Sequence, residues 1–312
     1  MRKIISGLGI ISGIVCAAGA SAESVTLTGD FPAAYREASF LTRMAIDRFD
    51  GGDGPALSIA LERALSGNGG AAHFAVMSMA RRSGMGPVDA DGVLSGVVST
   101  EVNENRDVQK REECAEKVDN KCTKKQQVEI ICRKRTIDVI ADLRIVRARD
   151  RSVAYSSRKS RHDEVTWCPN ASAPGAVEGT IRGMIDSVAA ETAREIAPYT
   201  ERYVLRFYEN RTGMPKDISN EFKAAIRLTQ QNLPEACRAF AAIDTALPGQ
   251  VSVTYDLGIC AEARGDYAEA MALYQRAAAI RPRDRADFDA GIDRTQRLIV
   301  ARNDERERQR RR

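Results

Sequence analysis

Histidine is nearly absent from this sequence of 312 residues, which holds only His73 and His162. Many catalytic bases and zinc sites use histidine, and zinc sites without it need closely spaced cysteine pairs. No C-x2-C pair occurs, and neither do the motifs G-x-S-x-G, H-E-x-x-H or the P-loop. Asp47, Asp50 and Asp53 lie beside glycines, but their spacing differs from that of an EF-hand loop. The sequence therefore predicts a protein that is not an enzyme and has no metal or cofactor.

Long apolar runs are also missing beyond the N-terminal segment, so no later stretch has the roughly 18 apolar residues of a membrane span. Residues 1–22 begin with two basic side chains, continue as an apolar stretch and end on Ala-Ser-Ala. This pattern is typical of a signal peptide, which we expect to be cleaved before Glu23. Cys16 follows Val15, where a lipoprotein signal has a small residue. We therefore expect a periplasmic protein without a lipid anchor.

Six cysteines remain after residue 22, and an even number in an oxidising compartment is typical of disulfides, although composition leaves their connectivity open. A hairpin turn near residues 148–151 would place Cys132 opposite Trp167, and one bulge would bring Cys168 opposite Cys132. Two further cysteines fall on helices that we expect to be neighbours, and the last two then close a charged loop. The expected pairs are Cys132–Cys168, Cys237–Cys260 and Cys114–Cys122.

The first part of the chain alternates between strand-like and helix-like segments. Helical spacing of apolar residues predicts helices over residues 54–67 and 177–197. The stretch 126–146 is rich in β-branched residues and is predicted to be one long strand. We expect residues 23–209 to form an α+β domain, with a mixed sheet and helices packed on one face. The expected strands cover residues 24–31, 40–51, 73–79, 91–102, 126–146, 153–168 and 202–209.

Three segments of this domain resemble the CsgG-like envelope domain that curli-secretion and penicillin-binding-protein-activator lipoproteins share. They are "LTRMAIDRFDG" before the first helix, "ADGVLSGVVS" in the strand that follows, and "DLRIVRARDRSVAYSS" in a hairpin. The resemblance covers residues 24–209 and depends on the order in which the three segments occur. It implies an envelope protein with the α+β fold of that family.

The hairpin segment from Glu101 to Arg135 departs from the export-channel members of that family. Channel hairpins are apolar on the side that faces lipid, whereas this segment is charged on both faces and is expected not to enter a membrane. Residues 106–161 hold 17 Lys and Arg against nine Asp and Glu. This excess favours either a charged strand edge or a patch between Cys122 and Arg135 that binds an anionic envelope surface. The patch lacks aromatic residues, which argues against nucleic acid.

A polar linker at residues 210–217 precedes a helical region at residues 218–312. Within this region, "YDLGICAEARGDYAEAMALYQRAAAIRP" resembles a tetratricopeptide repeat, and three of its signature positions recur about 34 residues earlier. We therefore expect two repeats followed by a capping helix. The signature residues are Leu257, Gly258, Ala270, Tyr274 and Pro282, with Ala236, Phe240 and Pro248 one repeat length earlier.

Together these patterns predict a periplasmic scaffold that holds a protein partner during cell-envelope assembly. The repeat resemblance implies that the partner contacts the first helix of each repeat. Two alternatives remain open: a component of an envelope export or transport complex, and a thiol–disulfide enzyme, although the C-x-x-C motif is missing. The expected partner-binding residues are Glu221, Ala225, Leu228, Tyr255, Ile259 and Glu262.

Overall fold

The computed structural model describes residues 23–66, 73–78, 89–169, 171–172, 174–282 and 285–311. Contacts divide the chain into two compact units, here called the sheet unit and the helical unit. The expected signal peptide and the end of the strand expected at residues 73–79 lie outside the described residues. The sheet unit comprises Gly29–Glu201 and Arg297–Arg312, and the helical unit comprises the residues up to Thr28 and Arg202–Gln296.

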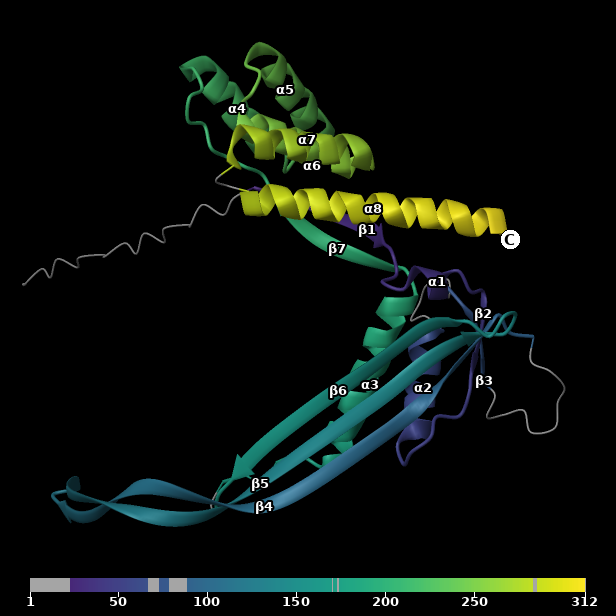
Figure 1. Cartoon of the computed structure of the whole chain (residues 1–312). Coiled ribbons are helices and arrows are strands. Elements are labelled where there is room, and N and C mark those ends of the chain that lie inside the picture. Colours follow the sequence, from purple (N-terminus) through teal and green to yellow (C-terminus); the bar gives the residue numbers. More distant parts are fainter. Residues whose placement is uncertain are drawn as a thin grey trace, which may run out of the picture. The chain divides into compact units, whose positions relative to one another are not determined.

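The sheet unit is built on a five-stranded mixed sheet with the order β3-β2-β4-β5-β6 (Figure 1). Strand β2 runs parallel to β3 and β4, whereas β4, β5 and β6 are antiparallel neighbours. This arrangement is the mixed sheet that the sequence predicts. The strands are β2 (Arg43–Ile46), β3 (Ala75–Ser78), β4 (Gly92–Val118), β5 (Lys121–Arg147) and β6 (Val153–Trp167).

Helices α2 (Gly54–Leu65) and α3 (Val177–Ile196) provide the apolar side chains that cover one face of this sheet. Alternate residues of β5 from Ile137 to Ile145 are buried in the same core, because successive side chains of a strand point to opposite faces. Both helices lie where the apolar spacing predicts them. A short helix, α1 (Arg36–Ser39), occupies a stretch that the sequence analysis leaves without structure.

Strands β4 and β5 continue past the end of β6 as a two-stranded ribbon (Figure 1). The turn at its tip uses Asp119 and Asn120, both with positive φ, as two-residue hairpin turns require. The expected end of the strand at residue 102 and the expected charged loop are therefore wrong. Both faces of the ribbon are polar, so the burial pattern that marks a strand in the sequence is missing there.

Strand β7 (Tyr199–Arg206) pairs with β1 (Ser24–Phe31) in a separate two-stranded sheet. The sequence correctly predicts both strands, but they lie outside the single mixed sheet that was expected for residues 23–209. The alternation of side chains indicates a strand, whereas the choice of its neighbour depends on the rest of the fold.

The helical unit contains four consecutive helices, and the pairs α4–α5, α5–α6 and α6–α7 pack against each other. Their shared core includes Phe222, Phe240, Ile259 and Tyr274. No helix in the described part of the chain has both the length and the apolar character that crossing a membrane requires. The four helices are α4 (Lys216–Leu228), α5 (Leu233–Ala246), α6 (Val251–Ala263) and α7 (Tyr267–Ile280), and a fifth helix, α8 (Arg285–Arg311), begins in this unit.

The units do not divide at the expected linker, residues 210–217. The division falls between Glu201 and Arg202, and the last part of α8 belongs to the sheet unit. Within that unit, Arg36 Nε donates to Asp304 Oδ1 at 2.7 Å, and Asp304 is buried. A fragment that stops at residue 215 therefore loses contacts of the sheet unit, which composition along the chain could not indicate.

Candidate binding groove beside a disulfide

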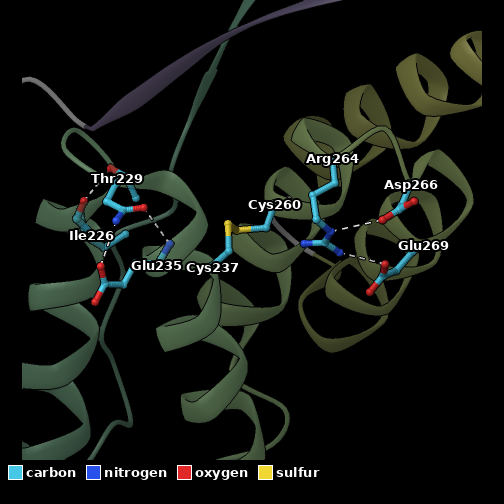
Figure 2. Close-up of a disulfide and its surroundings, with 9 residues drawn as sticks. Ile226, Thr229, Glu235, Cys237, Cys260, Arg264, Asp266 and Glu269 are labelled. Atoms are coloured by element: carbon cyan, nitrogen blue, oxygen red, sulfur yellow. Dashed lines mark hydrogen bonds and ion pairs between the residues drawn. A yellow bond between two sulfur atoms is a disulfide. The ribbon is translucent and has the colours of Figure 1, made fainter.

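A groove on the helical unit is lined by residues of α5, α6 and the beginning of α7. Its cavity measures about 490 Å³, which lies in the usual range of ligand pockets. The disulfide Cys237–Cys260 lines it and joins α5 to α6 (Figure 2). The remaining apolar lining consists of Leu233, Pro234, Ala241, Leu257 and Ala263.

Local sequence features position the two helices that form the groove. Helix α5 begins after Asn232, whose side chain accepts a hydrogen bond from the backbone N–H of Glu235 at 3.2 Å, and Pro234 lies in its first turn. The disulfide then fixes α5 against α6. Because Ala241 and Ala263 have short side chains, the space above this disulfide stays open.

Two arginines flank the groove and differ in their partners. Arg264 donates to Asp266 at 3.2 Å and to Glu269 at 3.0 Å, so its charge is neutralised locally (Figure 2). Arg238 is exposed, and within the described residues it forms no ion pair. The groove therefore combines an apolar lining with one arginine, Arg238, that forms no ion pair within the described residues.

The three disulfides join the cysteines in the pairs expected from the sequence, of which the strand register predicts Cys132–Cys168. Cys132–Cys168 lies at the end of β6. One bulge between Ile145 and Val146, next to the turn at the other end of the hairpin, shifts the β5–β6 register as expected. Cys114–Cys122 links the two strands of the ribbon near its tip, in place of closing a loop. The third disulfide is the one in the groove.

Four of the six expected partner-binding residues are buried and cannot contact a partner. Tyr255, Ile259 and Glu262 are 7 %, 0 % and 3 % exposed. The first part of α8 contacts this face of α6: Phe288 packs against Tyr255, and Arg294 binds Glu262. Ala225 is also buried, Leu228 is partly buried and Glu221 is exposed.

Glu262 is the centre of a buried ionic cluster in the helical unit. Its carboxylate accepts from Arg294 at 2.6 and 2.9 Å and from the hydroxyl of Tyr274 at 2.7 Å. Burial lowers the pKa of Arg294, but the hydrogen bonds and charge of Glu262 outweigh it and raise the pKa overall. Burial and the Glu262 charge raise the pKa of Tyr274 well above its ordinary value. The cluster is internally satisfied, as buried charges require.

The repeat signature residues lie at matching places in consecutive helix pairs. Ala236 and Phe240 on α5, like Ala270 and Tyr274 on α7, are 0 % exposed. A Cβ atom on Gly258 would lie 2.5 Å from the Tyr274 ring, so this position accepts only glycine without a shift of that ring. Leu257 is partly buried, and Pro248 and Pro282 are exposed just beyond the ends of α5 and α7.

Asp256 is a fully buried carboxyl group in the helical unit. Its Oδ1 accepts from the backbone N–H of Tyr208 at 2.8 Å, whereas Oδ2 has no hydrogen-bond partner. Burial raises the pKa of Asp256 well above its ordinary value, and the Tyr208 hydrogen bond opposes this only in part. Folding therefore favours the protonated form.

Asp256→Asn is expected to remove a pH dependence of stability. Because the folded-state pKa is raised, the folded chain binds this proton more tightly, and stability falls as pH rises from the unfolded pKa of about 3.9 toward the folded value. At about pH 8, we expect the variant to be more stable than the wild type by at least about 1 kcal/mol. Near pH 4 the gain should disappear. Thermal unfolding at both pH values measures this, with Asp293→Asn as an exposed control, and an equal difference at both pH values contradicts it.

A second buried ionic cluster joins α3 to β6 in the sheet unit. Lys159, whose side chain is 3 % exposed, lies 3.0 Å from Glu191 Oε1 and 2.8 Å from Glu195 Oε1. The hydroxyl of Tyr155 donates to Glu195 at 2.6 Å, and Arg161 pairs with Glu191. Arg161, followed by Lys159, lowers the pKa of Glu191. Each carboxylate thus has a cation, which indicates a structural cluster.

The two histidines lie apart from the groove, in the sheet unit. His162 Nδ1 is 2.7 Å from Asp138 Oδ1 on the neighbouring strand, and this hydrogen bond raises the pKa of His162. His73 Nε2 lies 2.8 Å from the backbone oxygen of Ser39. Across the residues that the structure describes, no group of three or more His, Cys, Asp or Glu side chains could hold a metal ion.

Sequence reasoning missed the groove and both buried clusters. Lys159 follows Tyr155 and Ser157 in the alternation of β6, so its inward position could have been predicted from the strand pattern. No local signal indicates the groove, because it arises where short side chains of separate helices meet a disulfide.

No protein-family model matches the chain, and no curated protein matches it. Among solved structures, a PelC dodecamer from Paraburkholderia phytofirmans is similar with a TM-score of 0.26 and 14 % identity, over 55 % of this chain and 96 % of that chain. A candidate lipoprotein from Caulobacter crescentus CB15 has a TM-score of 0.22 and 17 % identity, over 52 % of this chain and 88 % of that chain. These similarities are too weak to assign the chain to a family.

Proposed function

We propose that the chain is an extracytoplasmic binding protein, and not an enzyme, whose helical unit holds a protein partner in cell-envelope assembly. This proposal rests on the groove beside the Cys237–Cys260 disulfide. It replaces the buried face of α6 as the partner site, because the groove is open whereas Tyr255, Ile259 and Glu262 are covered.

The chemistry of the groove indicates its occupant. An apolar lining of this volume accepts a side chain such as leucine or phenylalanine, and Arg238 is placed to bind a carboxylate at its rim. The occupant is therefore an apolar segment of a partner protein with an acidic residue beside its apolar anchor. Arg264 contributes little to this, since Asp266 and Glu269 already neutralise it.

Three disulfides support a location in an oxidising compartment, where such bonds persist. The signal-like residues 1–22 support the same location, which we propose to be the periplasm. The α+β sheet unit is compatible with the CsgG-like domain that the sequence resembles. The matching burial of Ala236 with Ala270 and of Phe240 with Tyr274 supports two tetratricopeptide repeats in α4–α7.

Site-specific crosslinking in intact cells tests the groove. A photoreactive phenylalanine analogue at Ala241, which is exposed and lines the groove, should give a discrete crosslinked product. Adding Arg238→Glu to this protein should reduce the yield at least tenfold, because a carboxylate then faces the acidic residue of the partner.

The matched control places the same photoreactive residue at Ala224, an exposed alanine on α4 outside the groove. It should not give the product seen from Ala241. An identical product from both positions, or a yield at Ala241 that Arg238→Glu leaves unchanged, would remove the groove from the proposed function.

A further inference from the structure

A row of three side chains crosses the sheet unit where β6 ends and the two-stranded ribbon begins. Arg106 on β4 lies directly opposite Arg133 on β5, and Arg133 lies directly opposite Trp167 on β6. Directly opposed residues of antiparallel strands place their side chains on the same face. Two arginines and the only tryptophan of the chain therefore lie side by side on one face.

The two arginines form a like-charge cross-strand pair, an arrangement that destabilises a sheet unless an anion neutralises it. Glu104 is the nearby carboxylate, and its Oε2 lies 3.8 Å from Arg133, whose side chain is 70 % exposed. Arg106 is exposed, and within the described residues it forms no ion pair. One carboxylate at this distance leaves the pair with a net positive charge.

A third arginine adds buried charge beside this pair. Arg135 is 5 % exposed and lies two residues from Arg133, on the same face of β5. Its guanidinium lies 6.0 Å from the Trp167 ring centre and donates to the backbone oxygen of Gly175 at 3.0 Å. Its Nε has no hydrogen-bond partner, and Glu104, which lies directly opposite on β4, is paired with Arg133 and forms no ion pair with Arg135. A buried cation without an ion pair is costly, and its field attracts an anion to the adjacent surface.

The N-terminus of α3 lies next to this group, because Gly175 precedes the N-cap residue Ala176. No side chain caps the 20-residue helix, so its first N–H groups add partial positive charge. Glu178 in the first turn supplies the opposing charge. The positive charge of the three arginines and the helix N-terminus thus exceeds the negative charge of the two carboxylates, Glu104 and Glu178.

We propose that Arg106 and Arg133, with the charge of Arg135 behind them, bind a phosphoryl group. Arginine side chains donate two parallel hydrogen bonds to phosphate, and a tetrahedral dianion has enough oxygen atoms to accept from both exposed arginines at once. A single carboxylate has only two oxygens for the same four donors. The site belongs to the sheet unit, so it does not depend on the groove or its partner.

Trp167 fluorescence tests the proposal directly, since no other tryptophan contributes to the signal. Titrating the full chain with inorganic phosphate should give a saturable change. Arg106→Gln with Arg133→Gln should weaken this response at least tenfold. Lys124→Gln with Lys125→Gln removes the same charge near the ribbon tip and should leave the response unchanged. Phosphate should also raise the melting temperature of the wild type but not that of the Arg106→Gln/Arg133→Gln variant.

Vesicles of phosphatidic acid and phosphatidylcholine distinguish the source of the phosphoryl group, because the phosphatidic acid headgroup is a phosphomonoester with three free oxygens. Cosedimentation that the Arg106→Gln/Arg133→Gln variant loses supports the site and assigns it to a lipid headgroup. A phosphate response without cosedimentation supports the site and assigns it to a soluble ligand. The proposal is overturned if phosphate changes the fluorescence no more than sodium chloride does at equal ionic strength and the chain does not cosediment with the vesicles. It is also overturned if the Arg106→Gln/Arg133→Gln variant responds as the wild type does.

Discussion

Replacing Glu262 by lysine is expected to lower the free energy of unfolding of the helical unit by about 3 to 5 kcal/mol. The substitution removes the acceptor of both Arg294 and Tyr274 and places a second cation beside Arg294, in a site where the carboxylate side chain is fully buried. Urea unfolding followed by circular dichroism measures the change.

Glu221→Lys is the matched control, because it makes the same substitution at an exposed position of α4 in the same unit. It should change stability little. Replacing the pair together, as Glu262→Leu with Arg294→Met, should recover much of the loss, since neither charge is then left unpaired. Equal stability of Glu262→Lys and Glu221→Lys would mean that the carboxylate is not buried against α8, and Glu262 would again be available to a partner.

Lys159→Met is expected to destabilise the sheet unit by about 3 kcal/mol. Methionine fills similar space but cannot donate, so Glu195 keeps only the Tyr155 hydroxyl, and Glu191 keeps only Arg161. Thermal unfolding measures the loss.

Lys134→Met tests whether burial is the cause. Lys134 lies 2.8 Å from Glu164 on the same sheet, yet both side chains are well exposed, at 38 % and 45 %. Ion pairs of this kind contribute little to stability. A loss for Lys134→Met as large as that for Lys159→Met would contradict the role assigned to the buried cluster.

The groove and the arginine row lie in different units and recognise different chemistry. The groove has an apolar lining beside Arg238, whereas the row has two facing arginines beside the Trp167 ring. Crosslinking from Ala241 and Trp167 fluorescence therefore report on them separately. If both proposals hold, the chain can bind a protein partner and a phosphoryl group at the same time.

The pairing of Cys132 with Cys168 shows what the strand register, counted from the sequence alone, can predict. Once the turn near residue 150 fixes the β5–β6 hairpin, every opposed pair along it follows by counting, and one bulge brings Cys132 and Cys168 together. The periodicity of α3 and the recurrence of Ala236, Phe240, Ala270 and Tyr274 likewise predict which side chains are buried. Such features depend on local geometry, which repeats along the chain.

The burial of α6 shows what the repeat register does not predict. The helix is buried almost all round, so its sequence carries no stripe that separates an open face from a covered one. Tyr255, Ile259 and Glu262 were expected to face a partner because the repeat register allows it, and α8 covers them instead. Whether α8 covers this face depends on the path of the chain after α7. The sequence of α6 holds no information about that path.

The sequence by itself determined the α+β class, the helices α2 and α3, the apolar parts of the strands of the sheet unit, the helices of the C-terminal region and the choice of cysteine pairs, because periodicity and hairpin counting act over short distances. Only the tertiary structure decided the long ribbon, the separate β1–β7 sheet, the return of α8 to the sheet unit, and the positions of the groove and of the Arg106–Arg133 row. The β1–β7 sheet and the return of α8 bring together residues from elements far apart in the chain, and packing of the whole unit selects them among many possible neighbours. The ribbon, the groove and the Arg106–Arg133 row form between consecutive elements, but no apolar pattern in the sequence marks their positions.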